Sequence, residues 1–173
     1  MRVGLVTGTV GVGKSTVGYA VAQEASARGV PAAFLDVDEL SRLWPAPDGD
    51  PFNTALILAN LRAVTGNYRA AGAELLVLAW VVTDAEDLAA LERAVGTPVT
   101  AVRLTAEAAV VADRLRMRHQ GPERDGLDWH LRRAPELVGI QDRGLTLPVV
   151  EAGGPVDVVA AAVLERLTEL SPA

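Results

Sequence analysis

The stretch GTVGVGKST, residues 8–16, decides the fold expected for this chain. It matches the pattern G-x-x-x-x-G-K-S/T in full, with the fixed positions at Gly8, Gly13, Lys14 and Ser15. An alternating apolar run at residues 2–7 precedes it, and residues 14–28 carry apolar side chains at helical spacing. Strand, glycine loop and helix form the context that this pattern requires, which argues against a chance glycine-rich turn.

Each residue type in the loop suits phosphate binding. Glycines let the backbone curl, so that amide groups and the helix N-terminus face the phosphates. We expect a nucleotide to contact Gly11, Val12, Gly13, Lys14, Ser15 and Thr16. Lys14 would bridge the outer phosphates as a catalytic cation, and the Ser15 hydroxyl would bind magnesium. Lys14 is the single lysine among 16 lysine and arginine residues, which indicates that a compact ammonium is required there.

The remaining pattern predicts an α/β fold. Strands are expected at residues 2–7, 32–36, 75–82, 99–104 and 148–151. Helices are expected at residues 14–28, 38–44, 53–71, 84–95, 129–137 and 156–170, with a further one capped by Thr105 and running to Met117. Five strands alternating with helices predict a three-layer α/β/α sandwich around a five-stranded parallel sheet. With the glycine loop after the first strand, the predicted fold is that of a P-loop NTPase. We expect one domain, residues 1–173, with a short arginine-bearing lid at about residues 118–128.

Composition narrows the class of protein. The net charge of -6 argues against a nucleic-acid partner held by a basic surface. The chain has no cysteine and two histidines, which excludes disulfides, thiolate zinc sites and histidine-rich metal sites. No apolar run reaches the roughly 18 to 20 residues that cross a bilayer, and the N-terminus lacks a signal layout. We therefore expect a cytoplasmic monomer or homodimer that does not bind membranes.

Two carboxylates follow the second predicted strand. In a parallel sheet, ligands bind beyond the carboxyl ends of the strands, where Asp36 and Asp38 lie. Asp36 can hold magnesium while Asp38 accepts the proton of an attacking hydroxyl. Asp38 could instead cap the helix that follows. The third strand ends at Thr83 and Asp84 without a clean terminal acid. Either Ser15 and Asp36 are the main magnesium ligands, or Asp84 reaches the ion from one residue beyond the usual position; a helix N-cap is the favoured role for Asp84.

Arginines cluster in and after the helix that ends at Met117. Arg114 and Arg118 are four residues apart and share a helix face, while Arg116 and Arg124 complete the cluster. Such arginines neutralise charge that develops during phosphoryl transfer, and a loop that carries them can close to exclude water. A solvated basic face is the alternative. Arg132 and Arg133, on the next predicted helix, are weaker candidates.

These features resemble the small P-loop kinases of metabolites, which include adenylylsulfate, gluconate and shikimate kinases and chloramphenicol phosphotransferase. DVDELSR and ANLRAV look like the D-G-D-N-V-R and E-N-I-R-R-I motifs of adenylylsulfate kinase, and DRLRMRHQGPERDGLDW is similar to the lid of gluconate and shikimate kinases. The resemblance implies Asp38 as the general base or the carboxylate that orients the hydroxyl, and Arg62, with Arg42 or Asn60, as acceptor anchors. It also implies that Arg118 contacts the transferring phosphate and that Arg114 lies near the adenine or the phosphates.

The sequence thus favours ATP-dependent transfer of the terminal phosphate to a hydroxyl of a small molecule. ATP is preferred over GTP by the resemblance, and the guanine motif N-K-x-D is absent. The loop PAPDGDPFN, with Trp44 and Phe52, suits either an acceptor pocket with an apolar wall or a plain surface loop. The alternatives are a nucleoside or nucleotide kinase, an antibiotic phosphotransferase and a regulatory NTPase. The acceptor is left open, since Arg42 comes one position late and VVTDAED replaces the expected proline-tyrosine-arginine stretch.

Overall fold

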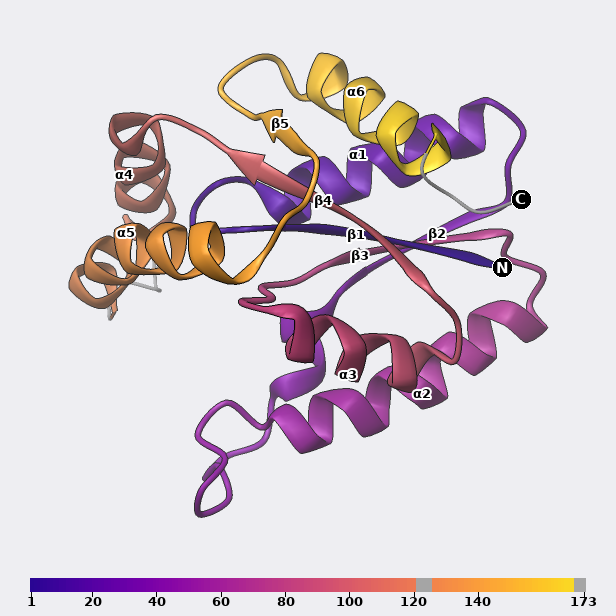
Figure 1. Ribbon diagram of the computed structural model, residues 1–173, viewed down its shortest axis with the longest axis horizontal. Helices are drawn as coiled ribbons and strands as arrows, with labels where there is room; N and C mark the ends of the chain where they lie inside the picture. The colour runs from indigo at the N-terminus through magenta and orange to yellow at the C-terminus, as the bar shows by residue number, and fades with distance from the viewer. Residues whose placement is uncertain (121–125, 170–173) are drawn as a thin grey trace.

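Five parallel strands form the centre of the protein, in the order β2-β3-β1-β4-β5 (Figure 1). The computed structural model describes residues 1–120 and 126–169. The strands are β1 (Arg2–Gly8), β2 (Ala32–Asp36), β3 (Leu75–Ala79), β4 (Val99–Thr105) and β5 (Val149–Glu151). The helices are α1 (Lys14–Ala27), η1 (Val37–Ser41), α2 (Thr54–Ala70), α3 (Ala85–Val95), α4 (Ala108–Arg118), α5 (Leu127–Gly144) and α6 (Val156–Glu169).

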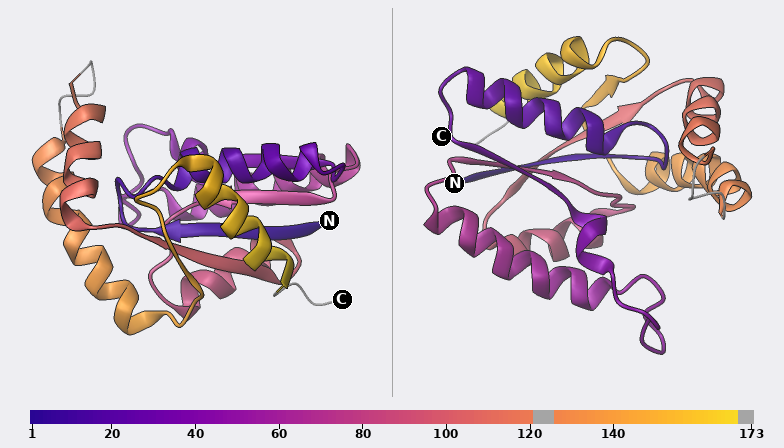
Figure 2. Two further views of the ribbon diagram at one scale, coloured as in Figure 1. Left: turned by 90° about the horizontal axis from the view of Figure 1, so that it is seen from above. Right: turned by 180° about the vertical axis from the view of Figure 1, so that it is seen from behind.

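Helices cover both faces of the sheet, as the sequence predicted. α1 and α6 lie on one face, and α2 and α3 on the other (Figures 1 and 2). The alternating side chains of each strand feed two separate cores: Val6 packs beneath α1 and α6, while Leu5 packs with α2 and α3. α4 and α5 lie beyond the carboxyl ends of β1 and β4 (Figure 1). The three-layer α/β/α fold with a five-stranded parallel sheet is confirmed.

The third strand is buried on both faces but shorter than the sequence indicated. All residues of β3 are buried, which explains its continuous apolar run. The prediction that it extends to Val82 is wrong, because β3 ends at Ala79. Beyond it, the Val82 amide donates to the Thr7 hydroxyl (3.2 Å) instead of to a strand carbonyl. A side chain of β1 therefore replaces the sheet ladder at this point.

The cap predicted at Thr105 is also wrong. Thr105 is the last residue of β4, and its carbonyl accepts a hydrogen bond from the Ala152 amide (2.7 Å). Glu107 occupies the N-cap position of α4 instead. The strand extends further than expected because β5 lies beside it, pairing Thr105 with Glu151.

α5 is twice as long as its sequence pattern suggested. The helix was expected at residues 129–137, but it continues to Gly144. Gln141 extends its buried face, since the Gln141 side-chain amide donates to the Val82 carbonyl (2.8 Å). Gln141 is buried but polar, so it does not continue the pattern of apolar residues at helical spacing. The predicted helix therefore ends at Leu137.

η1 is a short 3-10 helix rather than a helix over residues 38–44. The side chain of Asn53, just before α2, donates to the carbonyls of Ser41 (2.8 Å) and Leu43 (3.1 Å). Because these carbonyls accept hydrogen bonds from Asn53, they are not available to backbone amides of a longer helix. The chain continues instead into the loop that projects from the body (Figure 1). Residues 121–125 of the expected lid and Leu170 of the last predicted helix lie outside the described residues. Within the described part, no helix is long and apolar enough to cross a membrane.

Candidate active site

The glycine loop between β1 and α1 forms an open cradle of backbone amides. Gly8, Gly11 and Gly13 have φ angles of 139°, 77° and 107°, a region that favours glycine. A Cβ atom at Gly11 would lie 2.7 Å from Cγ of Leu115 in α4, so the loop also needs glycine for space. Gly13 holds the N-cap position of α1 without a side-chain cap. The first amides of α1 are therefore available to an anion.

Lys14 reaches back over this cradle. Its Nζ donates to the Thr9 carbonyl at 3.0 Å. Burial lowers the pKa of Lys14 to about 8, although the carboxylates of Asp38 and Asp36 act in the opposite direction. The Arg118 guanidinium adds to the lowering. Burial disfavours the charged form of Lys14, so pairing of its ammonium with an anionic ligand is favourable.

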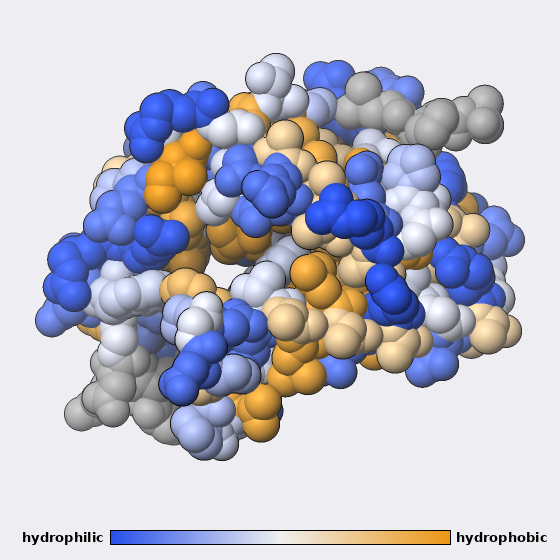
Figure 3. All heavy atoms as spheres, turned by 60° about the horizontal axis from the view of Figure 1, so that its bottom comes forward, coloured by the Kyte–Doolittle hydropathy of each residue, from blue (hydrophilic) through white to orange (hydrophobic). Residues whose placement is uncertain are grey.

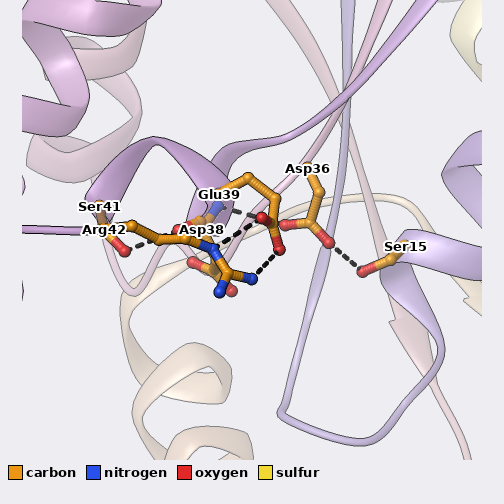
Figure 4. A network of polar contacts seen from close by, with 6 residues as sticks. All are labelled: Ser15, Asp36, Asp38, Glu39, Ser41 and Arg42. Carbon is orange, nitrogen blue, oxygen red and sulfur yellow. Dashed lines mark hydrogen bonds and ion pairs between the residues drawn. The ribbon is translucent and has the colours of Figure 1, made fainter.

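Asp36 links the loop to the end of β2. Its Oδ2 accepts a hydrogen bond from the Ser15 hydroxyl (2.5 Å), and its Oδ1 accepts one from the Asp38 amide (3.2 Å; Figure 4). Asp36, and not Asp38, therefore caps η1. This result removes the capping alternative for Asp38. A hydroxyl and a carboxylate side by side form a donor set of hard oxygens that fits Mg²⁺.

Asp38 lines the same cleft from the first turn of η1. Removal of its carboxylate from water raises the pKa of Asp38. Lys14 opposes this shift, Asp36 reinforces it, and Arg118 opposes it more weakly. Asp38 is thus a stronger base than a solvated aspartate. Glu39, the next residue, is turned to Arg42 in a two-bond ion pair (Figure 4).

Arg114 joins the glycine loop to the chain after β5. Its Nη1 donates to the Val12 carbonyl and its Nη2 to the Ala152 carbonyl, each at 2.8 Å. Arg114 and Arg118 both line the cleft, in agreement with their shared helix face. Arg116 faces solvent and pairs with Asp113, which matches the alternative of a solvated basic face for this residue.

Arg133 pairs with Glu136 at the surface, and Arg132 is exposed. Arg124 lies outside the described residues.

A cavity of about 600 Å³ unites these groups at the carboxyl ends of the strands. Residues 10–17 form one wall, Asp36, Asp38 and Glu39 a second, and Arg114 and Arg118 a third. Its size lies within the range of about 300–1,000 Å³ usual for ligand sites. The sequence analysis missed His130 of α5 and the apolar contributions of Ala152 and Val156, which also line it. These residues come from distant segments and carry no local motif.

The predicted acceptor anchors do not line this cavity. Arg42 is engaged with Glu39, and the Asn60 side chain donates to the Leu40 carbonyl (3.0 Å), so it holds η1 against α2. Arg62 is exposed on α2, and Phe52 is 63% exposed on the projecting loop. With the bottom of the view in Figure 1 turned forward, the surface shows an opening bordered by hydrophobic and hydrophilic residues (Figure 3).

Asp84 stands apart from the cleft. Its carboxylate accepts hydrogen bonds from the amides of Glu86 (2.9 Å) and Asp87 (3.0 Å) at the start of α3. The N-cap interpretation is confirmed. Asp84 is absent from the lining of the cavity that holds Ser15 and Asp36.

Comparison with known proteins agrees with this architecture. A family profile described as AAA domain matches residues 5–130, which span β1 to the first turn of α5. The chain belongs to this AAA domain family of P-loop proteins. The match includes the glycine loop, both carboxylates of the DVD segment and α4 with its arginines. No curated protein sequence matches the chain significantly.

Solved structures extend the likeness over nearly the whole chain. A gluconokinase from Sinorhizobium meliloti 1021 has a TM-score of 0.63 and 22% identity, covering 98% of this chain and 93% of that one. A tunicamycin resistance protein from Deinococcus radiodurans has a TM-score of 0.61 and 21% identity, covering 96% and 95%. An APS kinase from Mycobacterium tuberculosis, in complex with AMPPNP and APS, has a TM-score of 0.59 and 25% identity, covering 96% and 97%. The fold is that of the P-loop kinases, whose family binds ATP.

Proposed function

We propose that this AAA domain protein is an ATP-dependent phosphotransferase that moves the terminal phosphate of ATP to a hydroxyl of a small molecule. The observation that carries this proposal is the position of Asp38. Its carboxylate shares one cavity with Lys14 and Arg118 and has a raised pKa. A protein that only senses a nucleotide has no need of such a base beside the phosphate-binding lysine.

The glycine loop and α4 would hold the nucleotide. The open amides of residues 11–16 suit the phosphates, and Lys14 would exchange its bond to the Thr9 carbonyl for one to the outer phosphates. Ser15 and Asp36 would hold Mg²⁺, which supplies charge neutralisation on those phosphates. Arg114 fixes the loop against the segment after β5, near which the base of the nucleotide would lie.

The chemical step needs a base on one side and cations on the other. The acceptor oxygen forms a bond to the terminal phosphorus, the bond from that phosphorus to the bridging oxygen breaks, and ADP leaves. The hydroxyl proton passes to Asp38 and then to water. Lys14 and Arg118 would stabilise the charge on the transferring group. The raised pKa of Asp38 increases the proton affinity of its carboxylate.

The acceptor would occupy the side of Asp38 that faces away from the glycine loop. Asn60 supports this side by fixing η1 through the Leu40 carbonyl. Arg42, Arg62 and Phe52 lie outside the cavity lining, so we propose them only as contacts for the part of the acceptor that extends beyond the cavity, the arginines for polar or anionic groups and Phe52 as an apolar wall. The neighbours named gluconokinase and APS kinase support a kinase reaction, and the tunicamycin resistance protein keeps an antibiotic acceptor as a second candidate.

The test compares Asp38→Asn with the wild type in a screen of small hydroxyl compounds for acceptor-dependent ADP release. The variant should bind ATP and Mg²⁺ normally and lose transfer by at least about 100-fold, the scale of lost general-base help. Asp84→Asn is the matched control, because this carboxylate lies outside the cavity and asparagine also caps a helix. Transfer by Asp38→Asn at the wild-type rate would remove Asp38 from the mechanism. If no compound stimulates ADP release, the regulatory NTPase gains support.

A further inference from the structure

A second cavity, of about 440 Å³, lies between α4, α5 and the carboxyl end of β4. Its walls are mainly apolar: α4 contributes Ala108, Val111 and Ala112, and α5 contributes Leu131, Ala134 and Val138. The functional proposal above uses none of these residues. Leu115 lines both cavities, with its side chain against Gly11 of the glycine loop. The two cavities are therefore neighbours with Leu115 as a shared wall.

The charged residue in the lining of this second cavity is Arg103. Arg103 lies on the same face of β4 as the buried residues Val99 and Ala101, and only 13% of its side chain is exposed. Its Nη2 donates to the Asp142 carboxylate, which is 53% exposed. A guanidinium carries five donor hydrogens in a planar fork, so the one ion pair that Arg103 makes with the described residues, through one nitrogen, leaves capacity for a second anion.

The chemistry of the lining selects a ligand with two parts. An apolar body would replace water along the alanine, valine and leucine side chains, since removing apolar surface from water is favourable. A carboxylate would bind the Arg103 guanidinium by charge-assisted hydrogen bonds, which are about twice as strong as neutral ones. The volume falls within the usual range of about 300–1,000 Å³ for small-molecule sites.

We propose that this cavity is a binding site for a small amphiphilic carboxylate, with its apolar body between α4 and α5 and its carboxylate on Arg103. The site is distinct from the nucleotide cavity, so both ligands can bind at once. Thr9 of the glycine loop, whose hydroxyl donates to the Ala134 carbonyl (2.7 Å), is also part of the lining.

Three probes separate the parts of this proposal in calorimetric titrations and thermal-shift measurements. 4-Phenylbutyrate carries both the apolar body and the carboxylate, 4-phenylbutanol carries the body alone, and acetate carries the charge alone. We expect 4-phenylbutyrate to bind and to raise the melting temperature, with 4-phenylbutanol weaker and acetate without effect. The shift should persist with saturating ADP and Mg²⁺.

Two variants test the placement. Arg103→Gln should weaken 4-phenylbutyrate about tenfold or more, the scale of a lost charged hydrogen bond, and leave 4-phenylbutanol unchanged. An unchanged affinity for 4-phenylbutanol, together with normal ADP binding, would show that the Arg103→Gln variant is folded. Ala112→Leu should weaken both aromatic probes by filling the cavity. Arg28→Gln, which removes an exposed arginine paired with Glu24 on α1, should alter none of these affinities.

Four results would overturn the proposal. The first is the absence of 4-phenylbutyrate binding to the wild type at millimolar concentration. The second is an equal response to acetate, which would indicate a nonspecific surface anion. The third is wild-type affinity for 4-phenylbutyrate in Arg103→Gln or Ala112→Leu. The fourth is displacement of 4-phenylbutyrate by ADP, which would place the probe in the nucleotide cavity.

Discussion

Replacement of Arg114 by glutamine should destabilise the nucleotide-free protein far more than the same change at Arg116. Arg114 bridges the Val12 and Ala152 carbonyls with two hydrogen bonds of 2.8 Å, both partly buried. A hydrogen bond to a charged group contributes about 1.5–3 kcal/mol, and partial exposure places these two in the lower part of that range. We therefore expect Arg114→Gln to lower the free energy of unfolding by about 3–4 kcal/mol.

Arg116 provides the control on the same helix. It is 57% exposed and pairs with Asp113, and such surface pairs contribute about 0–1 kcal/mol. Urea denaturation of both variants, followed by circular dichroism without nucleotide, measures the difference. Equal losses in Arg114→Gln and Arg116→Gln would refute the claim that Arg114 holds the glycine loop against the segment after β5.

Three further predictions concern the cradle and the carboxylate. Lys14→Met should stabilise the nucleotide-free protein by roughly 1–3 kcal/mol below pH 8, because the pKa of Lys14 is lowered to about 8 and the charged form is disfavoured by burial. Between pH 8 and the ordinary lysine pKa of 10.5, the folded wild type binds fewer protons than its unfolded chain, so the stability of the wild type rises with pH. The stability advantage of Lys14→Met should therefore shrink across this window, which urea denaturation at several pH values measures. A stability difference that stays constant with pH would contradict the lowered pKa of Lys14. Gly11→Ala should lower the free energy of unfolding by about 1–3 kcal/mol, because Gly11 has a positive φ and lies close to Leu115. Gly66→Ala, in a helix with open space around it, should raise the free energy of unfolding by about 0.5–1 kcal/mol. Thermal denaturation that shows changes of the same sign in both variants would argue against the geometry of the glycine loop. Transfer should decline as pH falls through the raised pKa of Asp38, with the acid limb above the usual range for an aspartate; a pH-rate profile flat across that region would exclude Asp38 as the base.

Local signals in the sequence were sufficient for the centre of the site. The glycine loop, the two carboxylates after β2 and the arginines four apart on α4 are each encoded by contiguous residues. Their convergence follows from the parallel sheet, because its strands all end at one edge. The structure brings Lys14, Asp36, Asp38 and Arg118 into one cavity, as that reasoning required.

Long-range contacts explain what the sequence did not reveal. The length of α5 depends on Gln141 meeting the Val82 carbonyl, 59 positions away in the chain. Asp36 caps η1 because its carboxylate reaches both the Ser15 hydroxyl and the Asp38 amide. The spacing of the two aspartates alone does not decide which of them is the cap. His130 joins the cavity only because α5 packs on α4. Each of these facts requires the tertiary arrangement.

The destination of the terminal phosphate tests the central claim most directly. Phosphorus NMR of the wild type with ATP, Mg²⁺ and the hydroxyl compounds would follow the phosphate whichever compound receives it. Transfer predicts a new phosphate-ester signal that grows in step with ADP and is lost in Asp38→Asn. If all released phosphate is inorganic and no compound alters the rate of ADP formation, the protein is an NTPase and the account of Asp38 as a base toward an acceptor is wrong.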